Sequence, residues 1–203
     1  LGAVHGAIGI ITQVLLSLPR DRPRSHIASK VEPILQAVLS LQHPLSGNFP
    51  PSLSSRSSSS SSDHLVQFCH GSPGIVASLQ TIAAQPHLLP ASLQCAIESA
   101  IQRAQPDLAA RGLLIKDPCL CHGVPTNAFA LVSDSQFEQY LALTASTQLE
   151  ANSAWMRKAG QSSDFVGLYT GEAGRAWMWA VVDQMHHHGK TRWDMGIIGF
   201  NDL

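Results

Sequence analysis

Four short glycine motifs, each followed by an apolar stretch, constrain this sequence more than any other feature. They read HGAIG, HGSPG, HGVPT and TGEAG, and their first glycines are Gly6, Gly71, Gly123 and Gly171. Glycine lets the backbone turn sharply and lets two segments approach closely, so each motif predicts the start of a helix. The spacing fits one helical hairpin with its loops. Hairpins repeated in this way close into a toroid or stack as a solenoid.

The rest of the chain has a helical pattern. Apolar residues recur near the 3.6-residue period, and no stretch alternates over five residues as a half-buried strand would. The fold class is therefore predicted to be all-α. We expect helices over 7–18, 26–42, 73–85, 91–112, 125–145 and 171–186.

Residues 44–63 break this pattern. They read PLSGNFPPSLSSRSSSSSSD, which is low in complexity and has almost no apolar anchors. Such a segment cannot offset its ordering entropy by burial. We predict a disordered Ser-rich insertion between two helices of one domain that covers residues 1–203. A linker between domains is not expected, because the motifs on either side belong together.

Composition and charge argue against several classes of protein. The chain is 44% hydrophobic with a formal net charge of −1, and without a basic stripe nucleic-acid binding has little electrostatic support. No apolar run approaches the roughly 20 residues that span a membrane. The first residues, LGAV, contain neither an initiator Met nor a charged leader, so we expect a truncated chain without a signal peptide.

The number of cysteines bears on the compartment. Four cysteines are too few for a secreted disulfide scaffold, and two of them are followed directly by His, which favours metal binding. We expect a reducing, cytoplasmic compartment, with membrane association as an alternative.

Two Cys-His-Gly motifs carry the chemistry, with Cys69-His70 in one and Cys121-His122 in the other. Both precede an expected helix N-terminus, where the helix dipole favours a thiolate. Two thiolates and an imidazole suit zinc, and three ligands from Cys69, Cys121 and His122 leave a fourth position for water or substrate. Buried free cysteines are also common structural residues, so spacing alone leaves both interpretations open.

Other candidate residues occupy related positions. His5 is at the same repeat position as His70. It is either a capping or core histidine, or a general acid that faces the toroid centre, because His titrates near neutral pH. For His70 we favour a role near the metal other than ligation. Cys119 is expected to be a bystander, and Cys95 a core residue of a helix.

At these motifs the sequence resembles the lanthionine synthetase C-like family. The resemblance rests on HGAIGI at 5–10, FCHGSPGI at 68–75, LCHG at 120–123 and GLYTGEAG at 167–174. It covers nearly the whole chain and the C-terminal half of the family. It implies an α/α barrel of two nested helix layers, of which this chain forms a partial toroid. The Ser-rich insertion and the final FNDL are similar to eukaryotic, fungal-type members.

The resemblance also implies a site and a reaction. In this family, zinc would be held by Cys69, Cys121 and His122, and His5 would take part in proton transfer. The reaction adds a thiol, from glutathione or a peptide Cys, to dehydroalanine or dehydrobutyrine in a peptide or protein and forms a thioether. We therefore expect a zinc-dependent enzyme with His5 as the acid and His70 as the second choice, although a fragment can lack activity.

Two departures from the family pattern motivate a second hypothesis. Phe68 stands where the family usually has Trp, and Thr126 stands at a usual Gly position. The acidic residue that bacterial enzymes contribute from an earlier repeat has no position here. The alternative function is a scaffold in signalling that binds glutathione or a partner without turnover.

Overall fold

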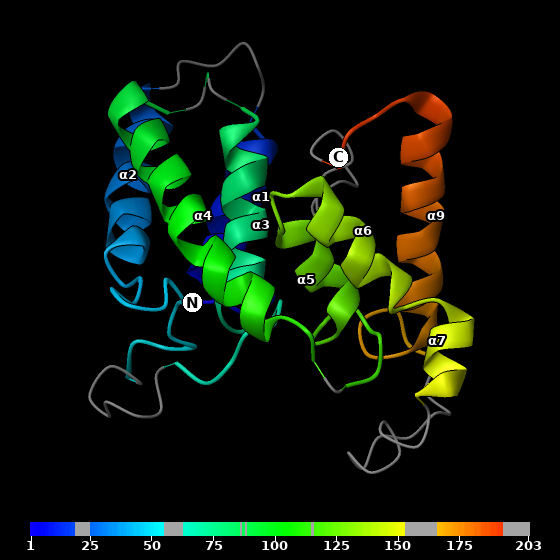
Figure 1. The fold of residues 1–203 in the computed structure, drawn as a ribbon. Coiled ribbons are helices and arrows are strands. Elements are labelled where there is room, and N and C mark those ends of the chain that lie inside the picture. Colours follow the sequence, from blue (N-terminus) through cyan, green and yellow to red (C-terminus); the bar gives the residue numbers. More distant parts are fainter. Residues whose placement is uncertain are drawn as a thin grey trace.

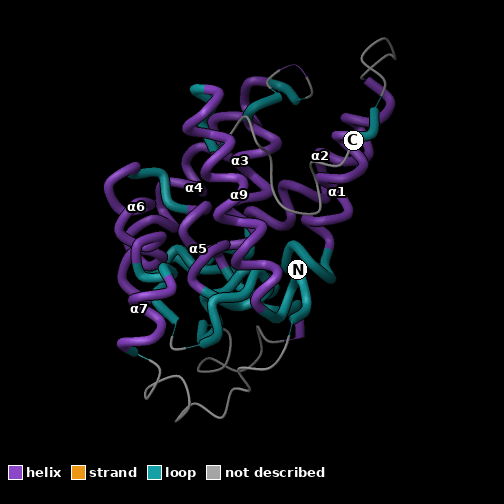
Figure 2. The backbone as a smooth tube through the Cα atoms, turned by 90° about the vertical axis from the view of Figure 1, so that its right-hand side faces the viewer, coloured by secondary structure: helices purple, strands orange, loops and turns teal. Residues whose placement is uncertain are grey.

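The structure is a computed structural model that describes residues 1–18, 25–54, 63–85, 87, 89–114, 116–152 and 166–192, with the backbone alone at 25–28. Every regular element in these ranges is a helix (Figure 2), which confirms the all-α prediction. No helix in the same ranges combines the length and the apolar character needed to cross a membrane. The helices are α1 (Ala7–Leu16), α2 (Ser25–Leu39), α3 (Ser72–Ala83), α4 (Ala91–Arg111), α5 (Val124–Ala130), α6 (Asp134–Ala142), α7 (Ser146–Ala151) and α9 (Glu172–His188).

Each glycine motif starts a helix, as the sequence predicts. Gly6, Gly71, Gly123 and Gly171 are the N-cap residues of α1, α3, α5 and α9. Gly71 has a φ of 110°, in a region that residues with a side chain rarely adopt. The other three N-cap glycines are extended.

A second glycine in three of the four motifs packs against a backbone carbonyl six residues earlier. Any Cβ at this position would collide with that oxygen, so only glycine allows the loop to fold back onto the first turn of its helix. The contacts join Gly9 to Ala3, Gly74 to Phe68, and Gly174 to Leu168.

Thr126 takes this place in the third repeat. Its Oγ1 donates a 2.6 Å hydrogen bond to the carbonyl oxygen of Leu120, again six residues earlier. The hydroxyl therefore replaces the close glycine contact, and α5 still begins at Val124 with Pro125 in its first turn, where proline is favoured. The departure from the family pattern at Thr126 leaves the start of the helix intact.

The helices pack in two layers. In the first layer α3 contacts α1 on one side and α5 on the other. In the second, α2 packs against both α1 and α4, α4 covers α3, and α6 covers α5. Figure 1 shows α9 at the opposite side of the molecule from α2, and the loops before α3, α5 and α9 lie at the same end. This order of hairpins is the expected partial toroid.

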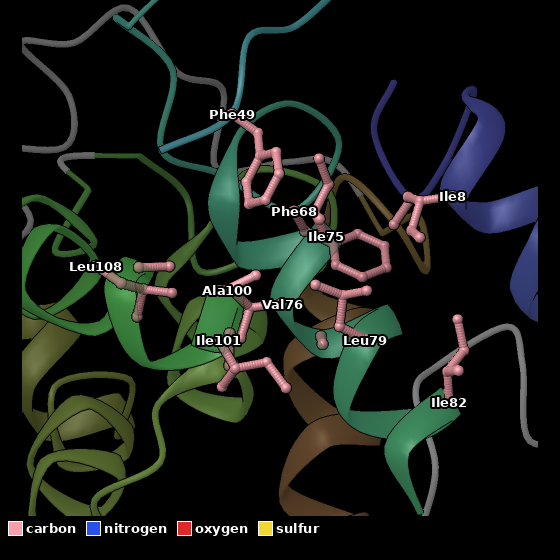
Figure 3. Close-up of a cluster of buried hydrophobic side chains, with 14 of the residues drawn as sticks. Ile8, Phe49, Phe68, Ile75, Val76, Leu79, Ile82, Ala100, Ile101 and Leu108 are labelled. Atoms are coloured by element: carbon pink, nitrogen blue, oxygen red, sulfur yellow. The ribbon is translucent and has the colours of Figure 1, made fainter. Parts of the chain in front are cut away.

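The core is centred on α3. The residues of this helix from Ser72 to Gln80 are all buried, as expected of a helix that is covered on every face. Figure 3 shows α3 between Ile8 of α1 and Leu108 of α4, with Phe49 and Phe68 of the preceding loops beside it. The loop that carries the first Cys-His-Gly motif is therefore anchored in the core.

The prediction of a disordered insertion at 44–63 is wrong for residues 44–54. Phe49 is fully buried, so this segment does have an apolar anchor. The Asn48 side chain donates to Asp63 Oδ1 at 2.9 Å and to the Leu65 carbonyl at 3.0 Å, and its Oδ1 accepts the Ser72 N–H at 2.7 Å. Residues 55–62 lie outside the described residues.

The helix expected over 125–145 is two helices. Helix α5 ends at Ala130, and α6 starts after Ser133, whose side chain accepts a hydrogen bond from the Gln136 N–H. A serine N-cap of this kind starts a new helix inside an apparently continuous apolar pattern.

Replacing Gly74 tests the carbonyl contact. The new Cβ of Gly74→Ala would collide with the Phe68 carbonyl and lie 2.9 Å from the Ala3 Cβ. We expect the free energy of unfolding to fall by about 1–3 kcal/mol, the usual cost of overpacking a filled site. Chemical denaturation followed by circular dichroism measures it. Thr126→Ser, which keeps the hydroxyl at the equivalent position, is the control and should lose less. An unchanged free energy of unfolding for Gly74→Ala would contradict the contact.

Candidate functional site

Equivalent positions of three consecutive repeats are joined by backbone hydrogen bonds. Cys69, Cys121 and Tyr169 each lie two residues before an N-cap glycine. The Cys69 N–H donates to the Cys121 carbonyl at 3.0 Å, and the Cys121 N–H donates to the Tyr169 carbonyl at 2.8 Å. We call this row of contacts the loop ladder. It brings the two Cys-His-Gly motifs to one place, although they are far apart along the chain.

The first loop of the chain packs against the same row. A Cβ on Gly2 would collide with the carbonyl of Cys69, so the absence of a side chain allows this close approach. The Gly6 N–H donates to the Gly2 carbonyl at 2.9 Å. The loop that carries His5 therefore lies beside the loop that carries Cys69.

The thiols of Cys69 and Cys121 influence each other. Interaction with Cys121 is the main cause that lowers the pKa of Cys69 to about 7, and interaction with Cys69, together with burial, raises the pKa of Cys121. Because the two groups are coupled, the opposite shifts describe the pair: its first proton is lost more readily than that of an isolated thiol, and its second is held more tightly.

Two neighbouring side chains favour the charge on Cys69. The Nε2 group of Gln67 donates to the Cys69 sulfur at 3.1 Å, and Lys116 donates to Oε1 of Gln67 at 2.6 Å. The positive charge of Lys116 also lowers the pKa of Cys69. Sequence analysis missed both residues. The one signal that could have found them is a hydrogen-bond donor within a few positions of each Cys-His-Gly motif.

His122 follows Cys121 in the same loop and is half-buried. Burial lowers its pKa, and Lys116 adds to this effect, while the nearby Asp117 carboxylate opposes it. The imidazole is therefore neutral at neutral pH and has a lone pair that could bind a metal.

The donor set fits zinc in part. Two cysteine sulfurs suit zinc, because a bound cation would replace their protons and stabilise both thiolates. Among the described residues, no three His, Cys, Asp or Glu side chains lie close enough together to hold a metal ion. The structure thus brings together Cys69 and Cys121, and ligation by His122 stays a prediction.

His5 and His70 lie near each other. His5 is exposed, and its charge lowers the pKa of His70, for which burial is the main cause. The Pro51 backbone acts in the opposite direction and raises the pKa of His70, and the Nδ1 atom of His70 is buried without a hydrogen-bond partner among the described residues.

The remaining cysteines differ in burial. Cys119 is fully buried, and burial raises its pKa. Cys95 is exposed on α4, so the prediction that it is a core residue is wrong. The apolar pattern around it does not fix which face of α4 carries this residue.

Comparison with known proteins gives the family. The sequence model described as lanthionine synthetase C-like protein matches residues 1–195. The chain belongs to the lanthionine synthetase C-like family. A relative of this lanthionine synthetase C-like chain is glutathione S-transferase LANCL1 from Danio rerio. The two are 34% identical over 140 residues, which is 66% of this chain. The match covers 30% of that relative, which is eukaryotic, as the sequence resemblance suggests.

Removing one thiol tests the coupling of the pair. Interaction with Cys121 is the main cause of the low pKa of Cys69, so Cys121→Ala should raise that pKa. In metal-free protein we expect the pH midpoint of Cys69 alkylation to move upward from about 7. Iodoacetamide labelling at a series of pH values, read by peptide mass spectrometry, measures it. Cys119→Ala is the control, and labelling of Cys95 is the internal standard. A midpoint that stays or moves down would contradict the thiol pair.

Proposed function

We propose that this chain carries the zinc site of a protein that activates a thiol and adds it to dehydroalanine or dehydrobutyrine residues. The observation that carries the proposal is the pair of thiols at equivalent repeat positions, whose loops are joined by the loop ladder. Membership of the lanthionine synthetase C-like family supports it.

The ligands of this proposal are Cys69, Cys121 and His122. Thiolate and neutral imidazole are preferred zinc ligands, and three protein ligands leave a position for an incoming thiol. Zinc, when bound, lowers the pKa of such a thiol so that it persists as a thiolate at neutral pH. The loop ladder and the core packing around Phe68 hold the two sulfurs before a metal binds.

The reaction needs a proton donor from the chain. As the thiolate forms a bond to the β-carbon of the dehydro residue, the carbon–carbon π bond breaks and its electron pair takes up a proton at the α-carbon. We assign this proton to His5, which is exposed and lies in the loop packed beside Cys69. Burial lowers the pKa of His70, so that ring holds a proton less readily and is the second choice.

Glutathione is the thiol that the surroundings favour. The ammonium group of Lys116 lies one hydrogen-bonded glutamine away from the Cys69 sulfur, and a fixed positive charge attracts an anionic thiol. The Danio rerio relative is named a glutathione S-transferase. The second substrate in this proposal is a dehydrated peptide or protein.

Zinc content of the natural full-length protein tests the ligands. We expect about one zinc per chain, as in other sites of this ligand set, and a loss of most of it in Cys69→Ala, Cys121→Ala and His122→Ala. Elemental analysis by mass spectrometry measures the ratio, with Cys95→Ala as the control. Full zinc content in both variants of the thiol pair would reject the metal site.

Turnover requires a separate measurement. With glutathione and a dehydroalanine peptide, we expect a zinc-dependent thioether adduct in the mass spectrum. His5→Ala should slow its formation by about 10²–10⁴-fold, the usual contribution of a general acid, and retain zinc. Tight glutathione binding without an adduct from the full-length protein would instead support the scaffold function and reject the enzyme.

A further inference from the structure

We propose that Gln67 is a positioning residue, which directs an amide N–H at the Cys69 sulfur and makes the two thiols of the site unequal. The consequence of this role for catalysis rests on the proposed function. The effect of Gln67 on the Cys69 sulfur does not rest on that function, because the effect can be measured in metal-free protein.

The Gln67 side chain starts from a fixed backbone. The Gln67 N–H donates to the His70 carbonyl at 3.1 Å, and the His70 N–H donates back to the Gln67 carbonyl at 3.2 Å. These two bonds close a tight loop around Cys69. The Gln67 side chain is buried as well, with 8% of the residue exposed, so its amide has little room to move.

Lys116 determines which way the amide points. An ammonium group has three donors and no acceptor, whereas a glutamine amide has one end of each kind. The 2.6 Å bond from Lys116 therefore requires the Gln67 oxygen. The NH₂ end then faces the sulfur of Cys69, at 3.1 Å. A charge-assisted bond of this kind is stronger than a neutral one and holds the amide in this orientation.

The result is an asymmetric pair of sulfurs. An N–H donor stabilises negative charge on Cys69. It also occupies one lone pair of the sulfur and leaves the other lone pairs to interact with Cys121. Among the side-chain hydrogen bonds of the described residues, Gln67 donates to the Cys69 sulfur and none is made to the Cys121 sulfur. Partners behind a metal ligand tune its donor strength and orientation. Gln67 would do this for Cys69 alone.

Cobalt substitution tests this role by absorption spectroscopy. A purely structural role of Gln67 would leave the absorption bands of the cobalt-substituted protein unchanged. Removal of the N–H donor raises the energy of the sulfur lone pairs, so the sulfur-to-cobalt charge-transfer band should shift to longer wavelength. We expect this shift in Gln67→Met, which has a similar shape, and in Gln67→Glu, which can still pair with Lys116. Zinc affinity of Gln67→Met, measured by competition with a chelator, should fall about 10–100-fold.

A second buried glutamine provides the matched control. Gln80 of α3 is 9% exposed, and its amide donates to the Ala130 carbonyl at 3.3 Å. Gln80→Met therefore removes a buried amide without a thiol partner, and we expect no band shift. Circular dichroism and the melting temperature of each variant establish that it is folded.

A measurement without metal separates this inference from the proposed function. At one fixed neutral pH, Gln67→Met should shift iodoacetamide labelling from Cys69 toward Cys121, measured as the preference for Cys69 over Cys121 in the variant and in the unmodified protein. If the unmodified full-length protein binds neither zinc nor cobalt, the proposed function fails and the labelling preference alone decides the role of Gln67. An unchanged preference, or an unchanged cobalt band in both Gln67 variants, would overturn the inference.

Discussion

The site depends on two backbone hydrogen bonds between equivalent loop positions. Each contributes only about 0.5–1.5 kcal/mol of net stability, so their importance is geometric. They join Cys69 to Cys121 and Cys121 to Tyr169 at 3.0 and 2.8 Å. Because the joined residues hold the same place in their repeats, their side chains leave the backbone in corresponding directions. The two thiols therefore lie together although their loops are far apart in the sequence.

The rest of the fold holds this ladder in place. Each loop folds back onto the first turn of its helix through a carbonyl contact, made by a glycine at Gly74 and by a hydroxyl at Thr126. Helix α3 is buried from Ser72 to Gln80, and so is Phe68 beside it. Rigid support of this kind is what a metal or thiol site needs in order to be preorganised. Gln67 and Lys116 then act on one sulfur of a pair that is already placed.

The sequence predicts those parts of the fold and of the site that follow from the repeat. Gly6, Gly71, Gly123 and Gly171 start the helices where the motifs predict, and the pairing of the two cysteines follows from their common register. The burial of Phe49 could not be predicted, because the composition of a Ser-rich segment hides a single anchor. The bond between Gln67 and Lys116 joins side chains 49 positions apart. Each residue lies near a Cys-His-Gly motif, but no local signal predicts that the two residues pair. The contribution of His122 to the site is still a prediction.

The most direct measurement of the central claim is the ligand shell of zinc in the purified full-length protein, by X-ray absorption at the zinc K edge. We expect two sulfurs at about 2.3 Å and at least one nitrogen at about 2.0–2.1 Å, the usual distances for these ligands. In Cys69→Ala, one sulfur should disappear from any metal that remains. A shell of nitrogen and oxygen alone in the unmodified protein would contradict the claim that the loop ladder joins two thiols on one ion.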